Sequence, residues 1–247
     1  MLQRTHRTPL LLFAFTAPFR GLGQVFAPGL RALAVGPLII NIVVVASLAA
    51  VAVLGFDALL AAWLPGELDW LAWLLWPLFG LALLLAFGIS AVALAAIIAS
   101  PFSGPLAYRT ARHLGHEPDQ PPRSFAAEIA HATITALRKT GYYLLLLIPV
   151  LVVAITPGLN LLGALAWFIF GSWVLAVEFM EAPLANDGQD FREVRRTLRA
   201  HRWPMLAFGA GTTLLAMIPV VNLLLVPAAV IGATHVRVRL PKRKDFG

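Results

Sequence analysis

The chain has 247 residues, of which 60% are hydrophobic and only 13% are charged. A water-soluble protein has too little interior to bury so much apolar surface, so the composition excludes a soluble domain and predicts an integral membrane protein. The net charge of +7 could suit a nucleic-acid-binding protein, but the basic residues flank apolar segments. This placement favours anionic lipid headgroups or an anionic substrate as partners, and no nucleic acid.

The uncharged runs are typical of membrane-spanning helices. Several reach the roughly 20 residues that a helix needs to cross a bilayer, and none alternates with the period of two that marks membrane strands. We therefore predict an all-α, polytopic protein that forms a single membrane domain over 1–247. The chain has no cysteine, which excludes disulfides and thiolate chemistry.

The first predicted element is an interfacial helix over 10–27. Phe15, Phe19, Leu22 and Phe26 follow the spacing of one helical face. We expect this face to lie in the membrane interface.

Two long membrane helices are predicted next, over 32–56 and 70–108. The loop between them, 57–69, carries three acids and no base. The second uncharged run is about twice as long as one crossing requires, so its helix must extend beyond the bilayer or break. The sequence Ser-Pro-Phe-Ser-Gly-Pro at 100–105 predicts a break.

The second half of the chain alternates polar and apolar segments. A cytoplasmic polar segment is predicted over 109–139, and two uncharged blocks, 140–177 and 203–236, are predicted to form helical hairpins before a basic tail at 237–247.

The two hairpins share the pattern Ala-x-x-Pro-x-x-Asn-Leu-Leu, which begins at Ala154 and again at Ala216. The stretches before the two prolines, 142–155 and 205–218, are shorter than the roughly 20 residues of a full crossing. We therefore expect proline-tipped hairpins that penetrate the membrane partway. Their tips would need burial in protein or in an aqueous cavity, which predicts a homo-oligomer or a pore.

The distribution of charge predicts the topology. The 19 lysines and arginines lie before the first long helix, in 109–139, in 192–202 and after residue 236, and none lies in 57–69. The positive-inside rule then places both termini in the cytoplasm. Six complete crossings would give the same sidedness, so the charges leave hairpins and full spans as alternatives.

No catalytic or cofactor signature is present: the sequence lacks His-Glu-x-x-His, Gly-x-Ser-x-Gly and a phosphate-binding Gly-rich loop. We therefore predict a protein that is not an enzyme and that uses no cofactor and no metal.

Five arginines form one basic face of a predicted helix between the hairpins: Arg192, Arg195, Arg196, Arg199 and Arg202. Contact with lipid phosphates is the simpler interpretation, and a field that gathers an anionic substrate is the alternative.

Five polar residues are candidates for a pore or a gate. Glu178 and Glu181 are spaced so that they can pair with the nearby arginines, gate an entrance or take up a proton. Asn41, Asn160 and Asn222 lie at membrane depth or at hairpin tips, where each amide needs a partner, so they either bind neighbouring helices or line a pore.

The most suggestive local site is Pro28-Gly29-Leu30-Arg31. Pro28 suits the first turn of a helix, Gly29 lets an anion approach backbone N–H groups, and Arg31 lies at the positive end of the following helix. This combination predicts an oxyanion site, although an arginine at a membrane boundary can also simply contact headgroups.

Several motifs together resemble the CysZ sulfate permeases of bacteria. They include Pro28-Gly29-Leu30-Arg31, the Ser-Pro-Phe-Ser-Gly-Pro sequence at 100–105, and the run from Ile218 to Thr234. The resemblance implies a channel or permease of the inner membrane that carries sulfate into cysteine biosynthesis, with sulfite or related oxyanions as further candidates, and an oligomeric assembly. A non-transporting scaffold, and an intramembrane enzyme that uses Glu178 and Glu181, are the alternative classes.

The resemblance also implies that Gly29, Leu30 and Arg31 bind sulfate. Family members often have a second arginine directly after this motif, whereas this chain has Ala32. We therefore expect either weaker binding or another base that completes the site. A second departure is Phe179 in a position where the family commonly has tyrosine.

Overall fold

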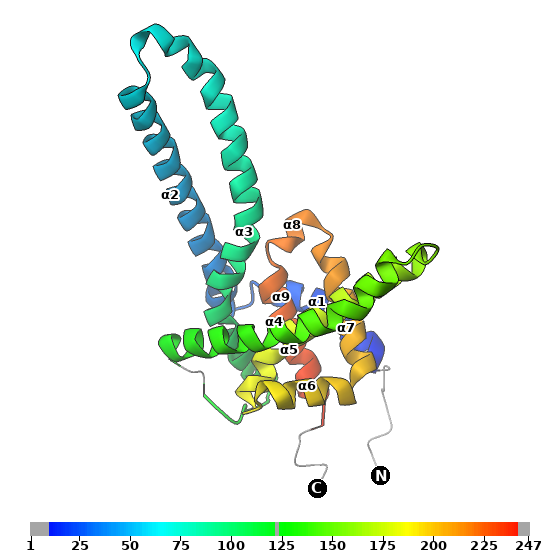
Figure 1. Cartoon of the computed structure of the whole chain (residues 1–247). Helices are drawn as coiled ribbons and strands as arrows, with labels where there is room; N and C mark the ends of the chain where they lie inside the picture. The colour runs from blue at the N-terminus through cyan, green and yellow to red at the C-terminus, as the bar shows by residue number, and fades with distance from the viewer. Residues whose placement is uncertain (1–9, 122–123, 242–247) are drawn as a thin grey trace, which may run out of the picture. The chain divides into compact units, whose positions relative to one another are not determined.

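The computed structural model describes residues 10–121 and 124–241. Every regular element within these ranges is a helix (Figure 1). The chain divides into two compact units, of which one comprises residues 36–99 and the other comprises 1–35 and 100–247. The predicted all-helical class is therefore confirmed. The end of the predicted basic tail, 242–247, lies outside the described residues.

The unit of residues 36–99 holds most of α2 (Arg31–Trp63), the short helix η1 (Gly66–Leu68) and the first part of α3 (Asp69–His113). The rings of Phe56 and Phe79 stack at 4.0 Å between centroids, with the ring of Trp76 edge-on at 5.0 Å from Phe56. The apolar windows of these two helices bury none of their residues within the structure. Their outer surface is therefore suited to lipid or to other protein, and not to water.

Two predicted boundaries in this region are wrong. The first long helix was expected to end at residue 56, yet α2 continues to Trp63, because the alanines and leucines at 58–62 are strong helix formers that a single Asp57 does not interrupt. The break expected at 100–105 is also absent, since α3 continues to His113. A proline removes one helical hydrogen bond and bends a helix without necessarily ending it.

The predicted polar segment 109–139 consists mostly of helix ends. It begins in the last turn of α3 and ends inside α4 (Phe125–Ile155), so only 114–124 connect the two helices. Ser124 caps α4 by accepting a hydrogen bond from the backbone N–H of Ala127 at 3.4 Å.

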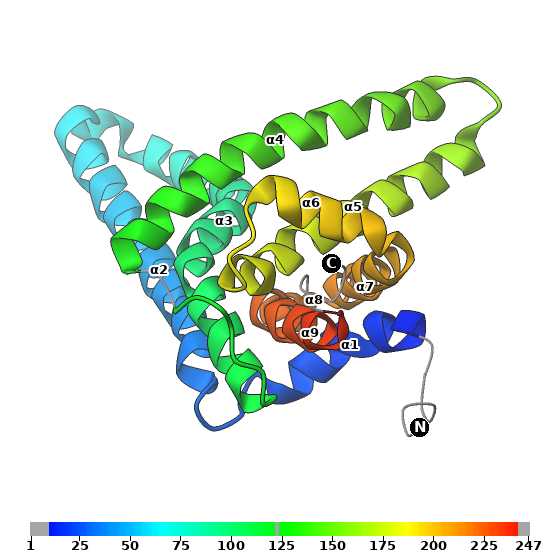
Figure 2. The ribbon, with the colours of Figure 1, turned by 90° about the horizontal axis from the view of Figure 1, so that it is seen from below.

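The larger unit is a helical bundle built from elements distant in sequence. Besides α4, it contains α1 (Leu10–Gln24), α5 (Asn160–Asn186), α6 (Phe191–Ala200), α7 (Arg202–Ala216), α8 (Pro219–Asn222) and α9 (Leu225–Arg239). Helix α9 packs between α1 and α5, and α7 packs against both α1 and α5 (Figure 2). Large buried side chains from these helices, among them Met180, Leu184, Phe208 and Ile231, form the core.

Glycines permit the close approach of these helices. A β-carbon at Gly209 would collide with the carbonyl of Ser172, and one at Gly211 would collide with the carbonyl of Phe15. Small residues at such crossings are typical of membrane helices, which gain stability from close backbone packing.

Helix α1 packs through a different face from the one that its aromatic spacing indicates. Its buried residues are mostly small: Phe13, Ala14, Ala17, Pro18 and Gly21. By contrast, Phe19 is exposed, as is Phe26 in the turn that follows the helix. Two residues of the predicted apolar face, Phe19 and Phe26, are therefore available to contact lipid, whereas Leu22 packs against the core.

Four helical segments are long and apolar enough to cross a membrane by length and composition: Arg31–Trp63, Trp70–Phe87, Thr133–Ile155 and Asn160–Asn186. Helices α7 and α9, with 15 residues each, reach only about 22 Å at 1.5 Å per residue, less than a hydrocarbon core of about 30 Å.

Candidate functional site

The Gly29-Leu30-Arg31 motif forms the turn that leads into α2. Gly29 has a φ of +86°, in the left-handed region that side chains disfavour. Leu30 is only 2% exposed and packs in the core, whereas Arg31 is the first residue of α2 and is exposed. Burial of Leu30 thus fixes a turn whose backbone and whose arginine face outward.

Backbone donors are available at this turn. The N–H groups of Leu30 and Arg31 both donate to the carbonyl of Ala27, at 3.0 and 3.1 Å. Within the described residues, the N–H groups of Gly29 and Ala32 have no backbone acceptor. Free N–H groups at the start of a long helix, together with its positive dipole end, attract anions.

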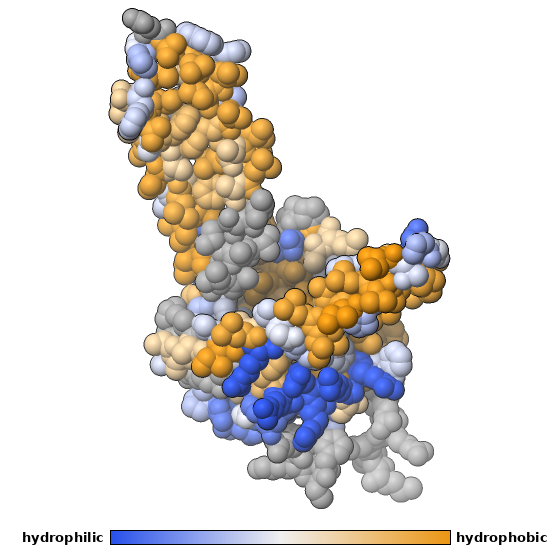
Figure 3. Space-filling model, in the orientation of Figure 1, coloured by the Kyte–Doolittle hydropathy of each residue, from blue (hydrophilic) through white to orange (hydrophobic). Residues whose placement is uncertain are grey.

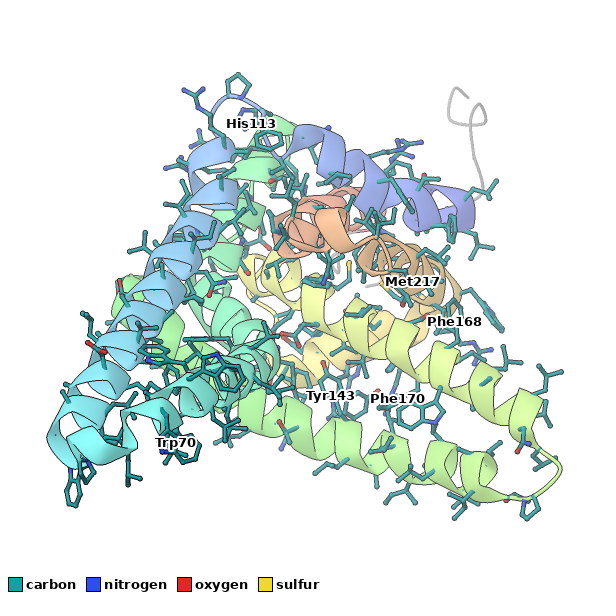
Figure 4. The ribbon with its side chains drawn as sticks, turned by 90° about the horizontal axis from the view of Figure 1, so that it is seen from above. Trp70, His113, Tyr143, Phe168, Phe170 and Met217 are labelled. Carbon is teal, nitrogen blue, oxygen red and sulfur yellow. The ribbon has the colours of Figure 1, made fainter. Side chains whose placement is uncertain are left out.

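A second base lies beside the motif. Arg109, in the last part of α3, donates from Nη1 to the carbonyl oxygen of Gly29 at 3.3 Å. His113, one turn later, lies beside the connection between α1 and α2 (Figure 4), and its Cε1 is 3.2 Å from where a β-carbon of Gly29 would be. Arg31, Arg109 and His113 are all exposed, so this corner of the molecule presents an accessible basic surface.

Sequence reasoning missed Arg109 and His113 as part of this site. In the sequence, these two residues appear only as part of the polar segment that begins where the uncharged run 70–108 ends. The expectation that another base completes a motif with Ala32 was the one signal that pointed to such a residue.

The predicted carboxylates form a cluster with a lysine. The Nζ of Lys139 on α4 lies 2.9 Å from Glu178 Oε2 and 2.7 Å from Glu181 Oε2, both on α5. Tyr143, which lies between α4 and α5 in Figure 4, donates its hydroxyl to Glu178 at 3.3 Å. Of the alternatives that the sequence left open, an ion pair is present, but its base is Lys139, shared by the two carboxylates, and not one of the arginines.

The three asparagines lie on separate elements. Asn160 is the exposed first residue of α5, and Asn222 is the exposed last residue of α8. Asn41 belongs to α2, where its side-chain oxygen is buried without a hydrogen-bond partner among the described residues. The structure thus groups the residues of the anion motif in one cluster and the two carboxylates in another.

A further buried network ties the end of α5 to α9 and α3. Arg237 Nε lies 2.5 Å from Asp187 Oδ2, and His116 Nε2 lies 3.5 Å from Asp187 Oδ1. The neighbouring Asn186 donates from its side chain to the carbonyl of Gly104 at 2.9 Å. This network compensates the buried charge of Arg237 and holds three distant segments together. The described residues contain no group of three His, Asp or Glu side chains placed to hold a metal ion.

The sequence of the chain matches a known protein family and several curated relatives. Residues 17–227 match the family described as sulfate transporter CysZ/etoposide-induced protein 2.4. The chain is 36% identical over 225 residues to a sulfate transporter CysZ of Pseudomonas aeruginosa LESB58, covering 89% of this chain and 92% of that protein. It is 34% identical over 227 residues to a sulfate transporter CysZ of Vibrio cholerae O395, covering 87% of this chain and 88% of that protein.

Proposed function

Since the chain belongs to the sulfate transporter CysZ/etoposide-induced protein 2.4 family, we propose that it transports sulfate across the bacterial inner membrane. Sulfate assimilation and cysteine biosynthesis would consume the imported anion. Four candidate membrane spans and the exposed apolar surface of residues 36–99 support a transport role within a bilayer. The relatives are named as transporters, which favours transport over catalysis.

The proposed sulfate site is the turn at Gly29, Leu30 and Arg31. A sulfate dianion leaves water only for several strong donors, and here the free N–H groups of Gly29 and Ala32 stand beside the Arg31 guanidinium. Arg109, already hydrogen-bonded to Gly29, supplies the second base that the motif lacks at Ala32. This contact between Arg109 and Gly29 is the observation that carries the assignment.

The exposed apolar side chains of the helices support a further proposal about the assembly. We place the α7–α9 pair partway into the membrane, with the termini in the cytoplasm and α1 in the interface. We place the α4–α5 pair partway as well, although both of its helices are long and apolar enough to cross. Exposed apolar side chains on these helices would be covered by lipid and by further copies of the chain. Lys139 with Glu178 and Glu181 would tune passage of the anion without covalent chemistry.

Flux of radiolabelled sulfate into liposomes that contain only this protein tests the proposal. We expect uptake above that of empty liposomes, and strong loss of uptake for Arg31→Ala at low sulfate concentration. Absence of uptake with correctly folded parent protein would contradict transport and favour a scaffold.

A further inference from the structure

A second basic pocket lies between α4 and α6, apart from the anion motif. It has a volume of about 520 Å³, and its walls come from residues 138–145 of α4 and from the beginning of α6. Three arginines line it: Arg138, Arg192 and Arg195. Its one carboxylate, on Asp190, is already engaged as the cap of α6, where it accepts from the N–H of Glu193 at 2.8 Å.

The three arginines have unused donors. No ion pair joins any of them to a carboxylate within the described part of the chain. Arg195 Nε is buried and has no hydrogen-bond partner among those residues. A cluster of guanidinium groups without an ion-pair partner attracts an anion that can accept several hydrogen bonds at once.

Aromatic side chains hold the central arginine in place. The guanidinium of Arg195 lies 5.1 Å from the ring centroid of Tyr142 and 5.3 Å from that of Phe191. Tyr142 in turn accepts a hydrogen bond from Trp173 Nε1 at 2.9 Å and packs edge-on against Phe191. The rings of Tyr142 and Phe191 therefore form an apolar part of the pocket wall and hold the Arg195 guanidinium beside it.

An exposed apolar stripe leads away from the pocket along α4. Leu145 lines the pocket and is 67% exposed, and Ile148 and Val152 continue the same helical face with 57% and 56% exposed. From Arg138 to Leu145 the helix rises about 10 Å, so the pocket spans the change from charged to apolar surface. Figure 3 shows this boundary, with hydrophilic side chains over α6 directly below the hydrophobic surface of α4.

We propose that this pocket binds an anionic phospholipid. The phosphodiester lies among Arg138, Arg192 and Arg195, and an acyl chain follows Leu145, Ile148 and Val152. Basic pockets between membrane helices on the cytoplasmic side have the chemistry that anionic headgroups require. A small inorganic anion would use the arginines but would gain nothing from the apolar stripe.

Native mass spectrometry of the purified full chain in a non-ionic detergent tests this proposal. Dioleoyl phosphatidylglycerol is titrated against dioleoyl phosphatidylcholine, which has the same chains and no net charge. We expect retention of phosphatidylglycerol and much weaker retention of phosphatidylcholine. Arg138→Gln with Arg192→Gln removes two exposed charges from the pocket and should weaken phosphatidylglycerol binding by roughly 10- to 30-fold.

The matched control removes the same charge from the same region without touching the pocket. Arg196→Gln with Arg202→Gln should leave the affinity within about threefold of the parent. An equal loss in both double variants would overturn the proposal, because binding would then reflect general attraction to a basic surface. Unchanged affinity in the Arg138 and Arg192 variant would overturn it as well.

A second pair of variants separates a lipid from a free anion. Leu145→Gln should weaken phosphatidylglycerol binding by about tenfold, whereas Leu144→Gln, at an exposed neighbour outside the pocket, should not. Inorganic phosphate and sulfate should displace the lipid poorly. Efficient displacement by either ion, with no effect of Leu145→Gln, would show a small-anion site and refute the lipid assignment.

Discussion

The guanidinium of Arg109 donates a hydrogen bond to the carbonyl oxygen of Gly29 at 3.3 Å, linking positions 80 residues apart. This contact places a base from α3 next to the turn that begins α2. If Arg109 completes the sulfate site, Arg109→Gln should weaken sulfate binding by about tenfold, the value of one charge-assisted hydrogen bond. Isothermal titration of the purified protein with sulfate measures the change.

Arg112→Gln provides the control for that variant, since Arg112 is an exposed arginine of the same helix and, among the described residues, the hydrogen bond to the motif comes from Arg109. Adding Ala32→Arg to Arg109→Gln should restore most of the affinity, because it supplies the second base directly after the motif. If Ala32→Arg improves the parent and the Arg109 variant by the same factor, the two bases act independently.

Arg31→Ala should reduce sulfate affinity by about ten- to a hundredfold, because the guanidinium is the main charge facing the anion. Arg31→Lys should retain part of the binding, since the charge remains while the planar pair of donors is lost. Sulfate titration of both variants provides the measurement. Parent-like affinity in Arg31→Ala would mean that the anion binds elsewhere and that Arg31 contacts headgroups.

Gly29→Val should impair sulfate binding without any change of charge. A side chain at a φ of +86° costs about 1–2 kcal/mol, and its β-carbon would lie 3.2 Å from His113 Cε1. The additional change His113→Ala should relieve the steric contact but not the backbone strain. Sulfate affinity that recovers fully in the double variant would show that the left-handed turn itself is dispensable.

Lys139→Met should destabilise the protein by about 1–3 kcal/mol, because Glu178 and Glu181 would lose their shared partner. Glu178→Gln together with Glu181→Gln should recover much of that loss in the Lys139→Met background. Denaturant titration in detergent gives the stabilities. In a wild-type Lys139 background, the double glutamine variant should still show some sulfate flux, and complete loss of flux from folded protein would indicate an obligatory proton step.

The connections at Gly158 and Asn222 should be shielded from the periplasm if the hairpins penetrate partway. Because the chain has no cysteine, a single cysteine at either position is the only thiol. In intact cells, an impermeant thiol reagent should label neither position, whereas a cysteine at Gly66, between the two long helices, should react. Rapid labelling of Gly158→Cys and Asn222→Cys would establish full crossings.

The helical class and the family could be read from the sequence because both depend on long uncharged runs and local motifs. Contacts between segments that are distant in the sequence could not be predicted in this way. Nothing local to Arg109 indicates that it meets Gly29, and the choice of Lys139 over the arginines as the partner of Glu178 depends on how α4 packs on α5.

Periodicity identified the large apolar side chains of α1 but not the small residues through which the helix packs against the core. In water, the face with large apolar side chains turns inward. In a protein whose outer surface is itself apolar, association instead relies on small residues such as Ala17 and Gly21, and the aromatic Phe19 is left outside. The ends of α2 and α3 were predicted wrongly for a different reason: neither Asp57 nor Pro101 is sufficient to stop a helix.

The burial of Leu30 has a consequence for the thermodynamics of the anion site. A residue with no polar atom in its side chain anchors the peptide groups that face the ligand, so the turn is preorganised before any anion arrives. Affinity at this site therefore depends on the fit of a hydrophobic side chain in the core as well as on charge. Leu30→Ala would loosen the turn and make binding entropically costlier, even though every donor and every guanidinium group would still be present.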